Sequence, residues 1–86
     1  MQKKVLEEKR QIIISYSLEH LPKTDKVRFF YALKGRNGKN GLILKNNIEQ
    51  LGRAVLLVPS QNSKETIKFL ESWGCNFHKK EVLLIR

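Results

Sequence analysis

The sequence predicts an α+β domain, a two-layer sandwich in which about four strands form a sheet with two helices on one face. Two observations carry this expectation. A continuous apolar stretch at residues 54–58 stops at Pro59, which is typical of a buried strand. The residues that follow have helical periodicity and lead into another apolar strand, so this part of the chain is a β-α-β unit. With 86 residues, the chain is expected to form a single domain over residues 1–86.

Residues 3–20 are interpreted as the first helix. Four residues at helical spacing share one face: Val5, Lys9, Ile12 and Tyr16. Pro22 ends this stretch, because the residue before a proline is kept out of the helical region. A second apolar stripe lies on another side: Ile14, Leu18 and Leu21. We therefore expect this helix to be buried on two sides or to form a homodimer contact through residues 3–20.

Residues 26–34 fit two interpretations, of which the strand is favoured. Every second residue is large and apolar, as a strand requires: Val27, Phe29, Tyr31 and Leu33. The alternative is a helix that is capped by Thr24 or Asp25 and ended by Gly35.

A stretch rich in glycine and asparagine follows and is expected to turn a β-hairpin. It holds two Asn-Gly pairs, at residues 37–38 and 40–41, which favour tight hairpin turns. Residues 42–44 resume an apolar run and are interpreted as the returning strand. Residues 46–50 are expected to form one helical turn, which Gly52 ends.

The last third of the chain has the clearest pattern. Three polar residues after the strand at 54–58 are able to cap a helix: Ser60, Asn62 and Ser63. Three apolar residues share one face of that helix: Ile67, Leu70 and Trp73. Gly74 is placed to end the helix, and residues 77–85 are expected to close the sheet as a strand. The full order, α-β-β-turn-β-α-β, resembles a ferredoxin-like arrangement with a shifted starting point.

Positive charge is concentrated in the middle of the chain. Seventeen Lys and Arg stand against eight Asp and Glu, which gives a formal net charge of +9. Residues 25–53 hold seven basic and two acidic residues, a surplus of five, and residues 34–45 hold no acid. Glycines let backbone N–H groups approach a phosphate, while Arg, Lys and Asn side chains donate hydrogen bonds to it. The candidate nucleic-acid-binding residues are Arg28, Lys34, Arg36, Asn37, Lys39, Asn40, Lys45 and Arg53.

These residues predict a small basic protein that contacts nucleic-acid phosphates through residues 34–45, with DNA favoured over RNA. In the strand interpretation, Phe30 lies on an exposed face with Arg28 and Lys34 and stacks on a base. The alternative function is a protein-interaction or dimerisation module, and the lesser alternative is a small nuclease or toxin. We expect no catalytic activity, no cofactor and no metal, because His20 and His78 lack neighbours at metal-ligand spacing.

Cys75 is the only cysteine, so an internal disulfide is impossible. The expected compartment is therefore reducing and intracellular, in the cytoplasm. Cys75 lies two residues after Trp73 and is expected to be a small buried apolar residue. The apolar runs are much shorter than the roughly 20 residues that span a bilayer, so no membrane partner is expected.

Overall fold

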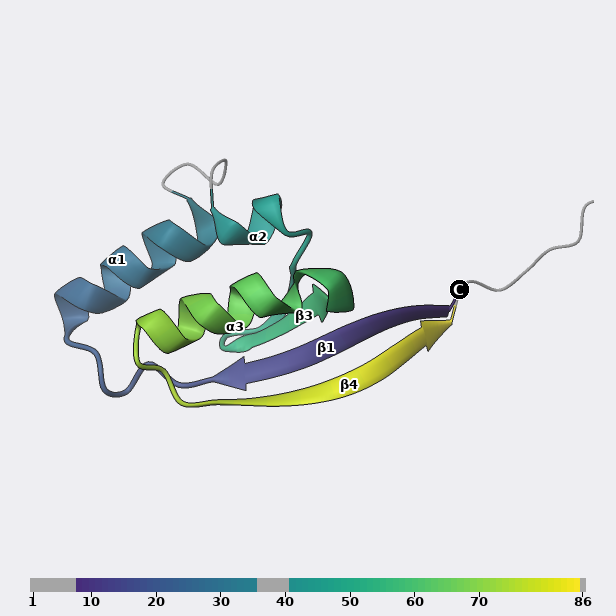
Figure 1. The fold of residues 1–86 in the computed structure, drawn as a ribbon. Helices are drawn as coiled ribbons and strands as arrows, with labels where there is room; N and C mark the ends of the chain where they lie inside the picture. The colour runs from purple at the N-terminus through teal and green to yellow at the C-terminus, as the bar shows by residue number, and fades with distance from the viewer. Residues whose placement is uncertain (1–7, 36–40, 86) are drawn as a thin grey trace, which may run out of the picture.

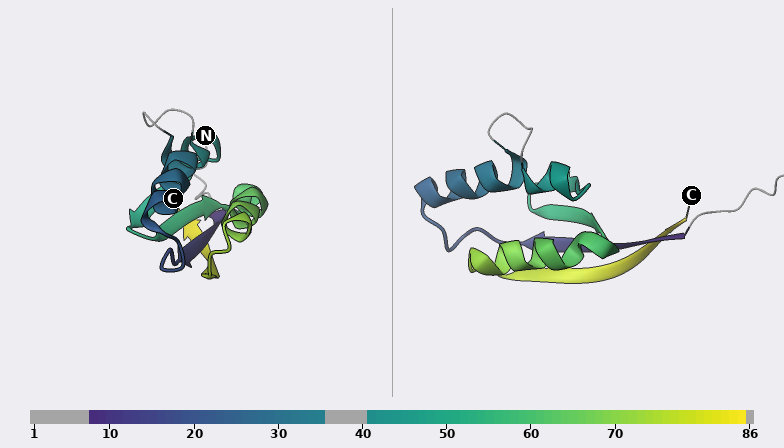
Figure 2. Two further views of the ribbon diagram at one scale, coloured as in Figure 1. Left: turned by 90° about the vertical axis from the view of Figure 1, so that its left-hand side faces the viewer. Right: turned by 45° about the horizontal axis from the view of Figure 1, so that its top comes forward.

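The computed structural model describes residues 8–35 and 41–85, with side chains for residues 10–35 and 41–83. In this part of the chain, a four-stranded antiparallel sheet carries two long helices, which confirms the α+β class. The elements are β1 (Glu8–Tyr16), α1 (Lys23–Lys34), α2 (Leu42–Lys45), β2 (Glu49–Gly52), β3 (Val55–Pro59), the 3-10 turn η1 (Ser60–Asn62), α3 (Ser63–Ser72) and β4 (Phe77–Ile85). The strand order is β2-β3-β1-β4, and α1 and α3 lie on the same face of the sheet (Figures 1 and 2).

The helix predicted over residues 3–20 is wrong for residues 8–16, which form the strand β1; residues 1–7 lie outside the described range. Ile12, Ile14 and Tyr16 are buried and alternate with partly exposed neighbours, which is the period of a strand. Three successive isoleucines favour this choice, since β-branched side chains pack well on a pleated surface. β1 is hydrogen-bonded to β3 on one edge and β4 on the other, so the predicted homodimer contact through a helix here is also wrong.

The strand favoured for residues 26–34 is wrong as well, and the helical alternative is confirmed as α1. Phe29 and Leu33, four residues apart, are fully buried, whereas Val27 and Tyr31 are 44% and 47% exposed. Burial therefore follows the helical period and not the alternation of large apolar residues. Gly35 ends the helix as expected, but no described side chain caps its start, where Pro22 precedes the first turn.

The hairpin predicted after α1 is wrong too. Residues 42–44 belong to the single helical turn α2, and the expected helical turn at residues 46–50 is replaced by a turn that leads into β2. Leu42 is buried while Leu44 is 60% exposed, so the apolar run covers the core with only one side. β2 is an edge strand in which all four residues are exposed. Its sequence therefore lacks the alternation of apolar and polar residues that would have predicted a strand.

The second half of the chain follows the prediction. Residues 55–59 form the buried strand β3, residues 63–72 form α3, and residues 77–85 form β4. Gly74 has a φ of 69°, which favours glycine, and its N–H donates to the Glu71 carbonyl oxygen at 2.9 Å. β3 and β4 run parallel to each other, since both are antiparallel to β1, which lies between them.

Aromatic rings fill the space between the two long helices and the sheet. Phe29 has no exposed area and contacts four other rings: Tyr16, Phe30, Phe69 and Trp73. Phe30 belongs to α1 and packs against Phe29 in the helix layer. The prediction that Phe30 lies on an exposed face of the sheet is therefore wrong. Cys75 is buried in the same core, as expected for a small apolar side chain.

Tyr16 gives the core a specific response to alkaline pH. Its hydroxyl is buried and has no hydrogen-bond partner among the described residues. Burial, and secondarily the charge of Cys75, raises the pKa of Tyr16 from 10.0 to about 12. Above about pH 10 the unfolded chain releases this proton while the folded chain keeps it, so stability falls as pH rises towards 12. Two pKa units correspond to about 2.7 kcal/mol, and solvent screening makes the actual loss smaller.

The Tyr16→Phe variant is expected to lack most of this alkaline loss. It is also expected to raise the free energy of unfolding at neutral pH by about 1 kcal/mol, because it removes a buried hydroxyl without a partner. Urea unfolding at neutral pH and again above pH 10 measures both effects, with the exposed Tyr31→Phe variant as the control. Equal alkaline loss in the natural chain and in Tyr16→Phe would contradict this assignment.

Candidate nucleic-acid interface

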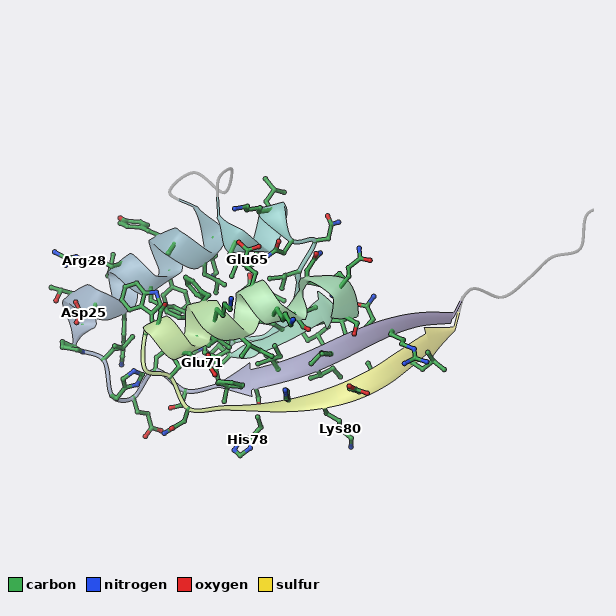
Figure 3. All side chains as sticks on the ribbon, in the orientation of Figure 1. Asp25, Arg28, Glu65, Glu71, His78 and Lys80 are labelled. Carbon is green, nitrogen blue, oxygen red and sulfur yellow. The ribbon has the colours of Figure 1, made fainter. Side chains whose placement is uncertain are left out.

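The exposed side of α1 combines basic, aromatic and aliphatic side chains. Because Phe29 and Leu33 face the core, the 3.6-residue repeat turns the opposite side of the helix to solvent. That side carries Val27, Arg28 and Tyr31, all exposed. Arg28 points away from the sheet in Figure 3. An arginine offers two parallel donors to a phosphate, and an aromatic ring offers a surface on which a base stacks.

The two glycines that border residues 36–40 meet at the C-terminal end of α1. Gly35 has a φ of 83°, and its N–H donates to the Tyr31 carbonyl oxygen at 2.8 Å. Gly41 is buried, and a Cβ atom there would overlap the Lys34 carbonyl carbon and the Gly35 nitrogen. Gly35 and Gly41 therefore lie side by side at the last turn of α1.

Lys34 stands at this junction, in the last turn of α1. Its Nζ lies 5.1 Å from the centroid of the Phe30 ring, a cation–π contact that holds the ammonium group against the helix. The negative end of the helix dipole also favours a cation at this position. Two of the eight residues predicted for the site, Arg28 and Lys34, are therefore brought to one helix.

Lys45 and Arg53 were also predicted for the site, and they lie on other elements than α1, in α2 and in the turn between β2 and β3. The Lys45 Nζ lies 3.5 Å from an oxygen of Glu65 on α3, and both side chains stay exposed to solvent, so this surface ion pair is weak. Arg53 lies in the turn between β2 and β3, next to Ala54, whose carbonyl oxygen accepts a hydrogen bond from the Tyr16 N–H at the end of β1. Arg53 therefore lies beside the end of β1 and not on α1.

The remaining four predicted residues lie in the segment at 36–40, outside the described residues: Arg36, Asn37, Lys39 and Asn40. Their assignment to the site stays a prediction from the sequence, in which residues 34–45 contain no Asp or Glu.

We name the face of the sheet that is turned away from α1 and α3 the open face. The periodicity of the sequence did not identify this face. Its described apolar residues are absent from the core cluster: Ile13, Val55, Leu57 and Val82. His78 and Lys80 of β4 extend from this face, away from the helices (Figure 3). The strand predicted at residues 77–85 already placed His78, Lys80 and Val82 on one side, because alternate residues of a strand share a face.

The described residues offer no other chemical centre. Among them, no three His, Cys, Asp or Glu side chains gather in a group that could hold a metal ion. Burial raises the pKa of the Cys75 thiol, which keeps it protonated and weakly nucleophilic. None of the helices formed by these residues has the length and apolar character to cross a bilayer.

Comparison with known proteins adds no relative to this description: the chain matches no protein-family model, no curated protein and no solved structure.

Proposed function

We propose that this protein binds nucleic acid through the exposed side of α1 and the acid-free segment at residues 34–45. The observation that carries the proposal is the contact between Gly35 and Gly41 at the end of α1. It ties both ends of a segment containing Arg36 and Lys39 to the helix that exposes Arg28. Phosphates neutralised along this side release counterions, which is the main source of affinity for a polyanion.

The order of elements supports a ferredoxin-like interpretation of the fold, with α2 as an insertion in a β-α-β-β-α-β series. Sheets of this kind that bind RNA stack bases on aromatic side chains of the sheet surface. The open face has no Phe, Tyr or Trp among its described positions, and the described phenyl rings of the sheet, those of Tyr16 and Phe77, pack on the helix side. The interface is therefore assigned to α1, and DNA remains favoured over RNA.

A titration at several salt concentrations tests this proposal. We expect the natural chain to bind labelled duplex DNA more tightly than single-stranded DNA or RNA. If four to six phosphates are contacted, log K should fall with log salt at a slope of roughly −4 to −5. The double variant Arg36→Ala/Lys39→Ala is expected to reduce that slope by about 2 and the affinity by about tenfold or more, because two phosphate contacts are lost.

The matched control is Lys64→Ala/Lys68→Ala, which removes the same charge from exposed positions of α3. This control should retain most of the affinity and keep its salt slope. Equal weakening in the two double variants would mean that only net charge matters and would reject the assigned interface. Absence of binding to all three nucleic acids at low salt would reject the function itself.

A further inference from the structure

We propose that the open face is an interface at which two copies of this chain form a symmetric dimer. The inference goes beyond nucleic-acid binding, which uses the opposite layer of the molecule. It depends on three features of the open face: its apolar centre, the arrangement of its charges across the strands, and the symmetry that this arrangement allows.

The centre of the open face is apolar but separate from the core. Leu57, on the central strand β3, is 8% exposed, yet it lies outside the core cluster that Leu56 and Val58 belong to. Ile13 of β1 lies directly opposite Leu57, and the two side chains therefore share this face. Val55 and Val82 extend the same apolar surface along and across the sheet. A second apolar layer of this kind is unusual on a surface that only faces water.

The charges on this face stand at its two edges and have opposite signs. The strand register places four residues in one row across the sheet: Glu49 of β2, Leu57 of β3, Ile13 of β1 and Lys80 of β4. The row therefore reads acid, apolar, apolar, base. Glu49 and Lys80 are both exposed and are three strand spacings apart, about 14 Å, too far to pair within one chain.

This row is complementary to itself under one kind of twofold axis. If the axis runs parallel to the strands between β1 and β3, β2 of one copy lies over β4 of the other. Glu49 of each copy then faces Lys80 of the second copy, and Ile13 faces Leu57. An axis across the strands would instead place each Lys80 against its own symmetry mate, which is unfavourable. The charges thus select a single face-to-face arrangement, with the aligned packing usual for two sheets.

The size of the face sets the expected strength of the dimer. Four strands about 4.8 Å apart make it roughly 19 Å wide, and three rows of side chains make it roughly 20 Å long. The area is about 380 Å² per copy and about 760 Å² in total, below the roughly 1,000 Å² of a stable interface, so we expect a weak dimer that dissociates at tens to hundreds of micromolar.

Charge-swapped variants test the arrangement by sedimentation equilibrium across the micromolar range. We expect Glu49→Lys and Lys80→Glu each to weaken dimerisation by about tenfold or more, since each turns two attractive pairs into two repulsive ones. The double variant Glu49→Lys/Lys80→Glu restores both pairs with their signs exchanged, and we expect it to dimerise within a few-fold of the natural chain. This rescue is specific to an intermolecular contact, because the two residues do not meet within one copy.

The matched controls lie on β4, the edge strand that carries Lys80, but on the helix side of the sheet. Lys79→Glu and Glu81→Lys make the same charge changes as the test variants, and we expect both to leave the dimer unchanged. Ile13→Lys should abolish the dimer while circular dichroism shows the natural fold.

A natural chain that stays monomeric throughout this range, or a double variant without rescue, would overturn the dimer. If Lys80→Glu leaves dimerisation unchanged but weakens nucleic-acid binding more than Lys79→Glu does, the open face binds nucleic acid and is not the dimer interface.

Discussion

Replacing Phe29 by alanine is expected to lower the free energy of unfolding by about 3–5 kcal/mol. The side chain has no exposed area, and its ring lies 5.2–5.6 Å, centroid to centroid, from four neighbours: Tyr16, Phe30, Phe69 and Trp73. A single ring thus joins β1, α1 and α3, and its removal leaves a cavity that rigid neighbours fill only partly. In a domain of this size each kcal/mol lowers the melting temperature by about 4–8 °C.

Chemical denaturation of the Phe29→Ala variant measures this loss, and Val27→Ala provides the control on the same helix. Val27 is 44% exposed, so we expect its truncation to change stability by less than about 0.5 kcal/mol. A loss below about 1 kcal/mol for Phe29→Ala would show that this ring does not anchor α1 to the sheet.

The Gly41→Ala variant is expected to cost about 2–3 kcal/mol, although it adds only one methyl group. The added Cβ would overlap backbone atoms at the end of α1, namely the Lys34 carbonyl carbon and the Gly35 nitrogen. Backbone atoms cannot move aside as a flexible side chain does, so α1 and α2 must separate. The same separation would open the Gly35 junction, and nucleic-acid affinity should fall together with stability.

Gly52→Ala is the matched control for this substitution. Its nearest neighbours would be side-chain atoms of Val55 at 3.8 and 3.9 Å from the new Cβ, which is ordinary contact distance. We therefore expect Gly52→Ala to leave both unfolding and nucleic-acid binding close to those of the natural chain. If Gly41→Ala were as stable as Gly52→Ala, the close approach of α2 to α1 would be contradicted.

The candidate site could be predicted from the sequence only in part. The acid-free run at residues 34–45 is a property of composition, and the structure brings Gly35 and Gly41 of this run together at the end of α1. Its geometry was not predictable, because a hairpin tip and a helix–helix connection use the same glycine and asparagine residues. The pairing of Lys45 with Glu65 and the position of Arg53 beside the end of β1 follow from how α2, α3 and β2 pack.

The open face illustrates a second limit. Alternation within residues 77–85 places His78, Lys80 and Val82 on one face of a strand. The complementary residue, Glu49, joins that row only through the pairing of β4 with β1, β1 with β3, and β3 with β2. Such a row is made by contacts between residues far apart in the chain, and no local pattern encodes it.

By itself, the sequence determined the α+β class and the β3-α3-β4 half of the fold, whereas Gly35 marked a helix end only in the alternative to the favoured strand. In that half each pattern fits a single element: an apolar run before a proline fits a buried strand, and a helical period before a glycine fits a helix. Only the tertiary structure decided that residues 8–16 are a strand and residues 23–34 a helix. Both segments carry apolar residues at spacings that suit either element, and the choice follows from which side chains the sheet and the aromatic core bury together.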